Sequence, residues 1–93
     1  MKITKFPNGG ELREDSDGNK EWYLNGKYHR EHGPAIEYAD GDKFWFINDK
    51  RHREDGPAIE FANGDKSWYL NDEFIPCETQ KEFERLMKLK AFW

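Results

Sequence analysis

Cysteine and long apolar runs are scarce in this chain, and their scarcity excludes several classes of protein. Its 93 residues include one cysteine, Cys77, so an internal disulfide framework cannot form. No apolar run is long enough to span a bilayer, and the opening Met-Lys-Ile-Thr-Lys lacks the apolar stretch of a signal peptide. With a mean hydropathy of −1.15, the chain is predicted to be a soluble cytoplasmic protein without membrane association.

The chain also lacks a large excess of either sign of charge. Nineteen acidic residues against 15 basic ones leave a net charge of −4, distributed along the whole chain. Non-specific binding to nucleic acid or to an anionic membrane is therefore not favoured. The one local basic cluster, at 50–53, is followed at once by acidic residues, so no nucleic-acid interface is predicted there.

Motifs for catalysis and for cofactor binding are missing as well. Ser16 and Ser67 are the only serines, and neither stands in a Gly-x-Ser-x-Gly turn. No glycine-rich loop that could cradle a phosphate is present. Glu37 and Glu60 occupy the same position in two copies of a repeat, whereas an acid–base pair needs two different environments. We predict a non-enzymatic protein without a cofactor.

The three histidines are predicted to be structural rather than metal ligands. A structural zinc site needs four converging ligands, and His32, the neighbour of His29, is replaced by Asp55 in the second copy of the repeat. His29 and His52 are expected to fix their loops by hydrogen bonds. The adjacent charged residues are expected to form exposed ion pairs, Arg30 with Glu31 and Arg53 with Glu54.

Aromatic side chains are what the chain has in quantity, at 16% of its residues against only 35% hydrophobic residues in all. Four Trp, four Tyr and seven Phe are present. Because each ring can bury about 150–250 Å², a few large side chains are predicted to supply most of the apolar contact in a single small domain.

A repeat of 23 residues organises the middle of the chain. The segment 18–40 is followed by a second copy, 41–63, that is identical at 14 of 23 positions, and a third copy begins at Gly64 and stops after Asp72. A fixed period of this length indicates repeats that bury apolar surface against their neighbours. A side chain present in every copy is then expected to hold the stack together.

Turn signals divide the repeats into strands. Asn-Gly, Asp-Gly and Asn-Asp pairs recur between aromatic or β-branched segments, which is typical of tight hairpins. The fold predicted is mainly β, a single-layer antiparallel meander of 23-residue β-hairpin repeats with one C-terminal α-helix. An N-terminal hairpin (1–17) precedes the repeats (18–72), and the helix follows (77–93). The strands expected are 3–6, 11–14, 20–24, 35–38, 43–47, 58–61 and 66–70.

The C-terminal segment has the pattern of a helix. Thr79-Gln80-Lys81-Glu82 fits a capping box, and apolar residues follow at helical spacing. The helix is expected to cap the repeat stack, with a role in binding a partner as the alternative. Its apolar residues are Phe83, Leu86, Met87, Leu89, Phe92 and Trp93.

The repeat resembles a known family. Asn25-Gly26-Lys27 with His29, and 39–43 followed by an aromatic residue, are similar to the MORN repeat, and His52–Ala58 resembles the variant found in phage and other viral proteins. The usual Tyr-x-Gly is absent, because this chain has Trp-Phe-Ile at 45–47. The resemblance implies a scaffold or a binding surface; the lipid binding proposed for some MORN proteins is not carried over.

Positions at which the copies differ are the best candidates for function. Phe44 stands where the other copies have Glu21 and Ser67, so the fold does not require a ring there. Alternation places Phe44 beside a column of rings on one face of the sheet, where it offers a contact surface. The loop position of Tyr28 also changes, to Arg51. The candidate partner-binding residues are Phe44, Phe46, Tyr23, Tyr69, Arg51 and Tyr28. If the helix covers this face instead, Phe44 should contact Leu86, Leu89 or Trp93.

These observations favour a protein-binding module as the function. The viral resemblance suggests a phage accessory protein in the host cytoplasm that blocks a host defence complex sterically, as an anti-CRISPR protein does. The alternative is a structural scaffold that acts through homo-oligomerisation. Unless another element covers them, the strands 3–6 and 66–70 are expected to be edges with unpaired backbone groups. Self-association edge to edge, or face to face through the aromatic column, is expected.

Overall fold

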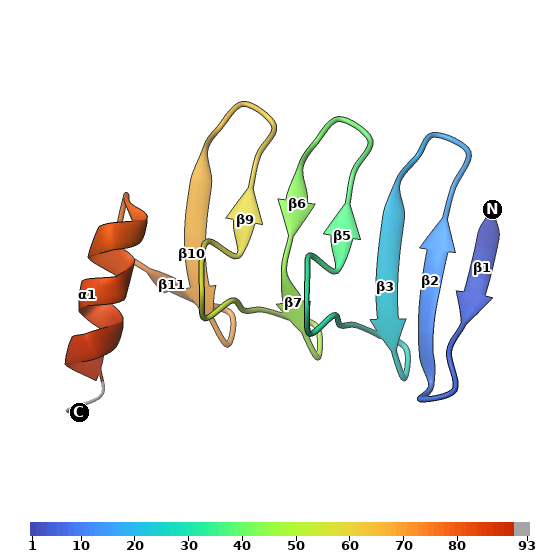
Figure 1. The fold of residues 1–93 in the computed structure, drawn as a ribbon, viewed down its shortest axis with the longest axis horizontal. Helices are drawn as coiled ribbons and strands as arrows, with labels where there is room; N and C mark the ends of the chain where they lie inside the picture. The colour runs from blue at the N-terminus through green and yellow to red at the C-terminus, as the bar shows by residue number, and fades with distance from the viewer. Residues whose placement is uncertain (91–93) are drawn as a thin grey trace.

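The computed structural model describes residues 1–90. Within this range the chain forms eleven β-strands and one α-helix, joined by turns and loops (Figure 1). In order, the elements are β1 (Lys2–Lys5), β2 (Gly10–Glu14), β3 (Lys20–Leu24), β4 (Lys27–Tyr28), β5 (Ile36–Glu37), β6 (Lys43–Phe44), β7 (Phe46–Ile47), β8 (Lys50–Arg51), β9 (Ile59–Glu60), β10 (Lys66–Leu70), β11 (Glu73–Ile75) and α1 (Gln80–Lys90).

The strands form one antiparallel meander in the order β1-β2-β3-β5-β6-β9-β10-β11, with β4 paired to β3 and a separate ladder of β7 and β8. The molecule measures 43 × 31 × 16 Å, and its short dimension suits a single layer of sheet with loops laid on it. Figure 1 shows α1 at the end of the sheet rather than across a face. The predicted fold class, a mainly β antiparallel meander with one C-terminal helix, is confirmed.

The strand boundaries agree with the sequence for the two longest strands of the repeats. β3 and β10 match their predicted ranges, but the strand predicted at 43–47 is interrupted at Trp45. The Trp45 amide donates to Ala58 O at 2.7 Å, and its carbonyl accepts from the His52 amide at 3.1 Å. The backbone therefore changes partner at Trp45. The short strands β4, β8 and β11 were not predicted.

Tight hairpin turns with left-handed backbone join β3 to β4, β7 to β8 and β10 to β11. Asn25, Asn48 and Asn71 have φ between 48° and 50°, and the following residues also have positive φ, Gly26 at 80° and Asp72 at 69°. Two successive positive φ values define a turn whose twist matches that of the flanking strands. Asn, Asp and Gly tolerate this conformation best, which is why the turns predicted at these pairs are present.

The best-buried core lies where α1 meets the last full strand. Trp68, Leu70 and Phe83 are buried, and Ile75, Cys77 and Met87 pack against them. α1 begins at Gln80, three residues later than predicted, and Thr79 caps it by accepting a hydrogen bond from the Glu82 amide at 3.2 Å. β10 is paired on both sides, with β9 and β11, so the edge expected at 66–70 is covered by β11. Phe92 and Trp93 lie outside the described residues.

Candidate functional site

The two faces of the sheet differ in what covers them. Trp22, Trp45 and Trp68 share one face, the tryptophan face. The loop after β4 places the Arg30 guanidinium over Trp22 at 3.7 Å, and the loop after β8 places Arg53 over Trp45 at 4.0 Å. At Trp68 the Phe83 ring of α1 takes this position, with ring centroids 6.4 Å apart. The tryptophan face is therefore covered along its length by loops and helix.

Each of these arginines is fixed on several sides. Arg53 Nη1 donates to the Pro57 carbonyl at 3.1 Å and to Glu60 at 3.2 Å, and its Nε donates to Asp55 at 2.9 Å. A Cβ added at Gly56 would meet the Arg53 guanidinium carbon at 2.7 Å. The predicted ion pair of Arg53 with Glu54 was wrong, because a guanidinium lying on Trp45 faces the strand carboxylate instead.

Arg30 makes the equivalent contacts in the first copy, but it lies farther from the strand carboxylate than Arg53 does. Arg30 Nη1 donates to the Pro34 carbonyl at 3.1 Å and lies 4.0 Å from Glu37. The predicted pair of Arg30 with Glu31 was therefore also wrong. Glu31 lies 3.6 Å from His29 Nε2 instead.

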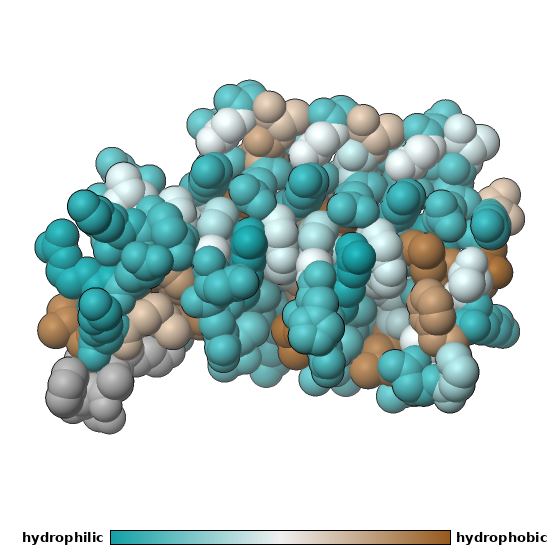
Figure 2. Space-filling model, viewed as in Figure 1, coloured by the Kyte–Doolittle hydropathy of each residue, from teal (hydrophilic) through white to brown (hydrophobic). Residues whose placement is uncertain are grey.

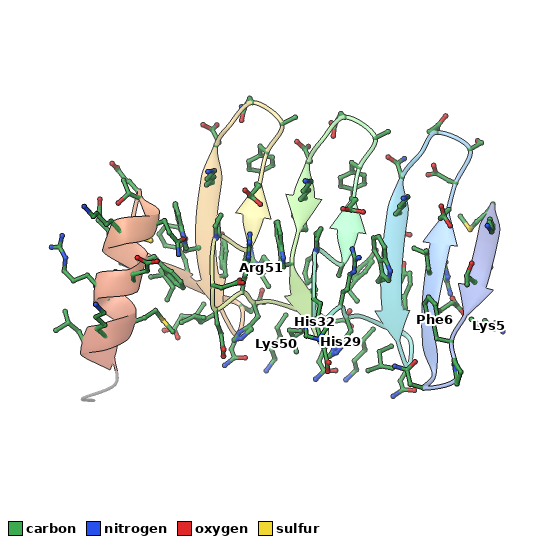
Figure 3. The ribbon with its side chains drawn as sticks, in the orientation of Figure 1. Lys5, Phe6, His29, His32, Lys50 and Arg51 are labelled. Carbon is green, nitrogen blue, oxygen red and sulfur yellow. The ribbon has the colours of Figure 1, made fainter. Side chains whose placement is uncertain are left out.

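The histidines fasten one repeat to the next. His29 Nδ1 accepts a hydrogen bond from the Asn48 amide at 3.2 Å, and His52 Nδ1 accepts one from Asn71 at 3.0 Å. This confirms that they fix structure by hydrogen bonds, and it extends the prediction to the neighbouring turn. Within residues 1–90, no three His, Cys, Asp or Glu side chains gather as a metal site. Figure 3 shows His29 and His32 in the loop after β4.

Five of the six predicted binding residues form a continuous row on the opposite face, the aromatic face. Tyr23 stacks on Tyr28 with centroids 4.8 Å apart, and Tyr28 lies 5.4 Å from Phe46. Phe46 pairs in register with Arg51, whose guanidinium lies 4.2 Å from the Tyr69 ring centre. Arg13 and Phe74 extend this row at its ends, over Tyr23 at 4.5 Å and against Tyr69 at 5.6 Å.

Several side chains of this row already bind other residues of the protein. The Tyr28 and Tyr23 hydroxyls donate to the two carboxylate oxygens of Glu21, at 3.1 and 3.2 Å. The neighbouring Tyr23 side chain, burial and Glu21 raise the pKa of Tyr28 well above its ordinary value, so this phenol stays protonated at physiological pH. The ring faces of Tyr23 and Tyr69 are taken by arginines. The row is built as a structural stack along the sheet.

Phe44, the first candidate from sequence, stands apart from this row. Its ring makes edge contacts with Tyr38 at 5.7 Å and with Phe61 at 6.0 Å. The Phe44 cluster, defined as Tyr38, Phe44 and Phe61, lies on the aromatic face. Phe44 is in register with Ile36, and Ile36 is in register with Glu21, which shares a face of β3 with Tyr23. Tyr38 and Phe61 are 41% and 40% exposed, which makes the cluster an accessible apolar patch.

Sequence reasoning missed Tyr38 and Phe61 as site residues, although a signal for them existed. The tight turns at Asp40-Gly41 and Asn63-Gly64 set the registers of β5, β6, β9 and β10. The first register brings Tyr38 diagonally opposite Phe44, within reach of an aromatic ring. Phe61 has the same place in the next copy.

Within residues 1–90, the helix does not cover the Phe44 cluster. Leu86 lines a cavity of about 450 Å³ together with Leu70, Phe74 and Met87, at the β11 end of the sheet, and Leu89 is 51% exposed. Trp93, the third contact expected, lies outside the described residues. Phe44 packs on its strand neighbours instead, so the patch faces outward.

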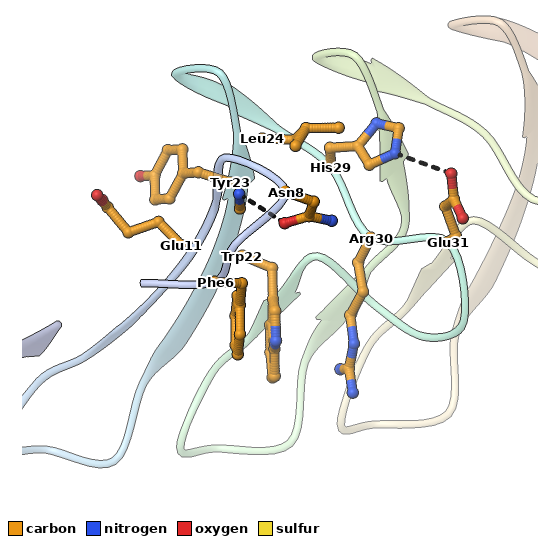
Figure 4. A pocket seen from close by; sticks show the side chains of 10 residues that line it. Phe6, Asn8, Glu11, Trp22, Tyr23, Leu24, His29, Arg30 and Glu31 are labelled. Atoms are coloured by element: carbon orange, nitrogen blue, oxygen red, sulfur yellow. Dashed lines mark hydrogen bonds and ion pairs between the residues drawn. The ribbon is translucent and has the colours of Figure 1, made fainter. Parts of the chain in front are cut away.

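A smaller cavity of about 200 Å³ lies on the tryptophan face near the N-terminal hairpin (Figure 4). In Figure 4 the Phe6 and Trp22 rings lie side by side, with Arg30 beyond Trp22. His29 and Glu31 also line the cavity, but His29 already binds the Asn48 amide. The cavity is an opening between structural side chains.

Comparison with models of protein families, with curated proteins and with solved structures finds no match to this chain. No helix within residues 1–90 is both long and apolar enough to cross a membrane.

Asp72 links the last two repeats and gives a pH-dependent prediction. Its Oδ1 accepts hydrogen bonds from Arg51 Nε at 2.6 Å and from the Arg51 amide at 3.3 Å. These bonds lower the pKa of Asp72 below its ordinary 3.8. The stability they provide is present above pH 3.8 and is lost as the pH falls through the lower folded-state value. We expect Asp72→Asn to flatten the loss of stability below about pH 4 in urea titrations across pH 2–6.

Asp15 serves as the comparison for that measurement, because its pKa is also lowered, first by its side-chain hydrogen bond with Asn19. Asp15→Asn should flatten the same window without affecting the Arg51 contact. An acid profile of Asp72→Asn that superimposes on that of the wild type would contradict the role of Asp72.

Proposed function

We propose that the protein is a non-enzymatic binding module that engages another protein through the Phe44 cluster. The observation that carries this proposal is an exposed three-ring patch at a position the repeat does not require, since the other copies have Glu21 and Ser67 there. Exposed aromatic side chains on a rigid sheet are typical anchors of protein interfaces.

The difference in cover between the two faces of the sheet supports the Phe44 cluster as the binding surface. Within residues 1–90, loop arginines lie over Trp22 and Trp45, and Phe83 of α1 packs on Trp68. Tyr38 and Phe61, on the aromatic face, stay about two-fifths exposed. Figure 2 shows the loop-covered side, where hydrophilic side chains dominate the middle of the sheet. A flat, thin molecule that presents the Phe44 cluster on one face suits steric blockade of a partner, the mechanism implied by the resemblance to viral repeats.

A substitution at Phe44 tests the proposal without disturbing the fold. Phe44→Ser introduces the residue that the third copy carries at this position, so we expect thermal unfolding within a few degrees of the wild type. Affinity capture from cells should recover a partner with the wild type and lose it with Phe44→Ser. Glu54→Ala, an exposed change in a loop on the tryptophan face, should retain that partner. Equal recovery of the partner with all three proteins would show that the Phe44 cluster does not bind it.

A further inference from the structure

The free edge of the sheet is β1, and it carries exposed apolar side chains. Within residues 1–90, β1 is the first strand of the sheet and pairs only with β2. Met1 is 81% exposed, Ile3 51% and Phe6 42%. Figure 2 shows hydrophobic side chains gathered at this end of the molecule, and Figure 3 places Lys5 and Phe6 along the edge. Exposed edges with apolar side chains favour pairing with another strand.

The hydrogen-bond register fixes which backbone groups are available. The Phe6 amide donates to Gly10 O at 2.9 Å, and bonded pairs alternate along an antiparallel ladder. Thr4 with Leu12 and Lys2 with Glu14 are therefore the next bonded pairs. The amide and carbonyl groups of Ile3 and Lys5 consequently point outward, away from β2.

We propose that β1 pairs with β1 of a second copy, antiparallel and centred on Thr4. In this register Ile3 of each copy lies opposite Lys5 of the other, so all four outward groups of each strand are bonded. Thr4 then faces Thr4, a favourable cross-strand pair, and no lysine faces a lysine. Lys2 and Lys5 already lie in register with Glu14 and Glu11 on β2, which offsets the charge that edge lysines otherwise present.

The other end of the sheet makes this a closed pair rather than a fibre. α1 stands beside β11 (Figure 1), and its Phe83 packs into the core with Trp68 and Leu70. A head-to-tail contact between β1 and that end would have to displace the helix. Pairing of β1 with itself uses the same surface in both copies, so it stops at two.

A two-fold axis through this strand pair is perpendicular to the sheet, so both aromatic faces point the same way. The dimer would then present two Phe44 clusters on one surface. Two linked contacts bind more tightly than one when a partner offers both. The dimer thus goes beyond the proposed single contact surface, and it can be tested without knowing the partner.

Cysteine cross-linking tests the register. In a Cys77→Ala background, Thr4→Cys places two thiols at the axis, where Cα atoms of a non-bonded pair are about 4.5 Å apart, within the range a disulfide accepts. Lys2→Cys is the matched control on the same strand face, and it would lie opposite Phe6 of the other copy. Under mild oxidation we expect at least about tenfold more covalent dimer from Thr4→Cys. Equal yields, or no dimer from either, would overturn the register.

Sedimentation equilibrium of the unmodified chain tests the association itself. The weight-average mass of the wild type should rise from 11.1 kDa toward twice that value as the protein concentration increases. Ile3→Pro removes an outward amide and leaves the bonds to β2 intact, so it should remain at the monomer mass. A wild type that stays monomeric at millimolar concentration, or an Ile3→Pro variant that dimerises equally, would refute the proposal.

Discussion

Replacing Phe83 with alanine is expected to lower the free energy of unfolding by about 3–5 kcal/mol. The Phe83 ring is 0% exposed and packs on Trp68, which is 2% exposed. Removing it would leave a cavity at the junction of α1 and β10, and the flat sheet has little material with which to fill it. In a protein of 93 residues this is a large part of the total stability. Urea titration followed by tryptophan fluorescence measures the change.

Leu89→Ala is the control, because Leu89 lies on the same helix and is 51% exposed. Leu89→Ala should lower the free energy of unfolding by less than about 1 kcal/mol. The comparison also decides between the two roles predicted for the helix. If α1 served mainly to bind a partner, both variants would leave the midpoint of unfolding nearly unchanged, and the capping role would be contradicted.

Local turn chemistry explains why much of the fold could be predicted from the sequence. Asn25-Gly26 and the equivalent pairs specify tight hairpins through their backbone conformation alone, and the long strands between turns show clear alternation. β4 and β8 have only two residues each, too few for any period to appear. Trp22 makes the same two backbone hydrogen bonds as Trp45, but β3 stays unbroken because β2 pairs with it along its whole length. Whether a strand has such a partner is not recorded in its local sequence pattern.

The candidate site was predictable only in part for a related reason. Comparing the copies identified Phe44, because that comparison needs no structure. Its partners Tyr38 and Phe61 follow from strand register, which alternation within one strand does not contain. Adjacency in the sequence predicts the wrong ion-pair partners for Arg30 and Arg53. The loops instead fold back over the tryptophans and bring Arg53 to Glu60.

Arg53→Ala is expected to destabilise the protein by about 2–4 kcal/mol, since it removes a cation–π contact and charged hydrogen bonds together. The Pro57 carbonyl, on a buried residue, would lose the donor 3.1 Å away. Trp45 would lose the guanidinium that covers its ring. Arg85→Ala, an exposed arginine on α1, is the matched control and should change stability by less than about 0.5 kcal/mol.

Arg53→Lys tests whether the positive charge alone stabilises the protein or whether the planar guanidinium is also required. Lysine keeps the positive charge but lacks the planar fork that reaches Pro57 and Glu60 while lying on Trp45. We therefore expect Arg53→Lys to lose at least half of the stability lost by Arg53→Ala, measured by the same urea titration. If lysine restored full stability, the contact would be a simple ion pair, and the close approach of Gly56 to the guanidinium would have no energetic role. A loss near that of alanine would show that the repeat requires arginine for its geometry.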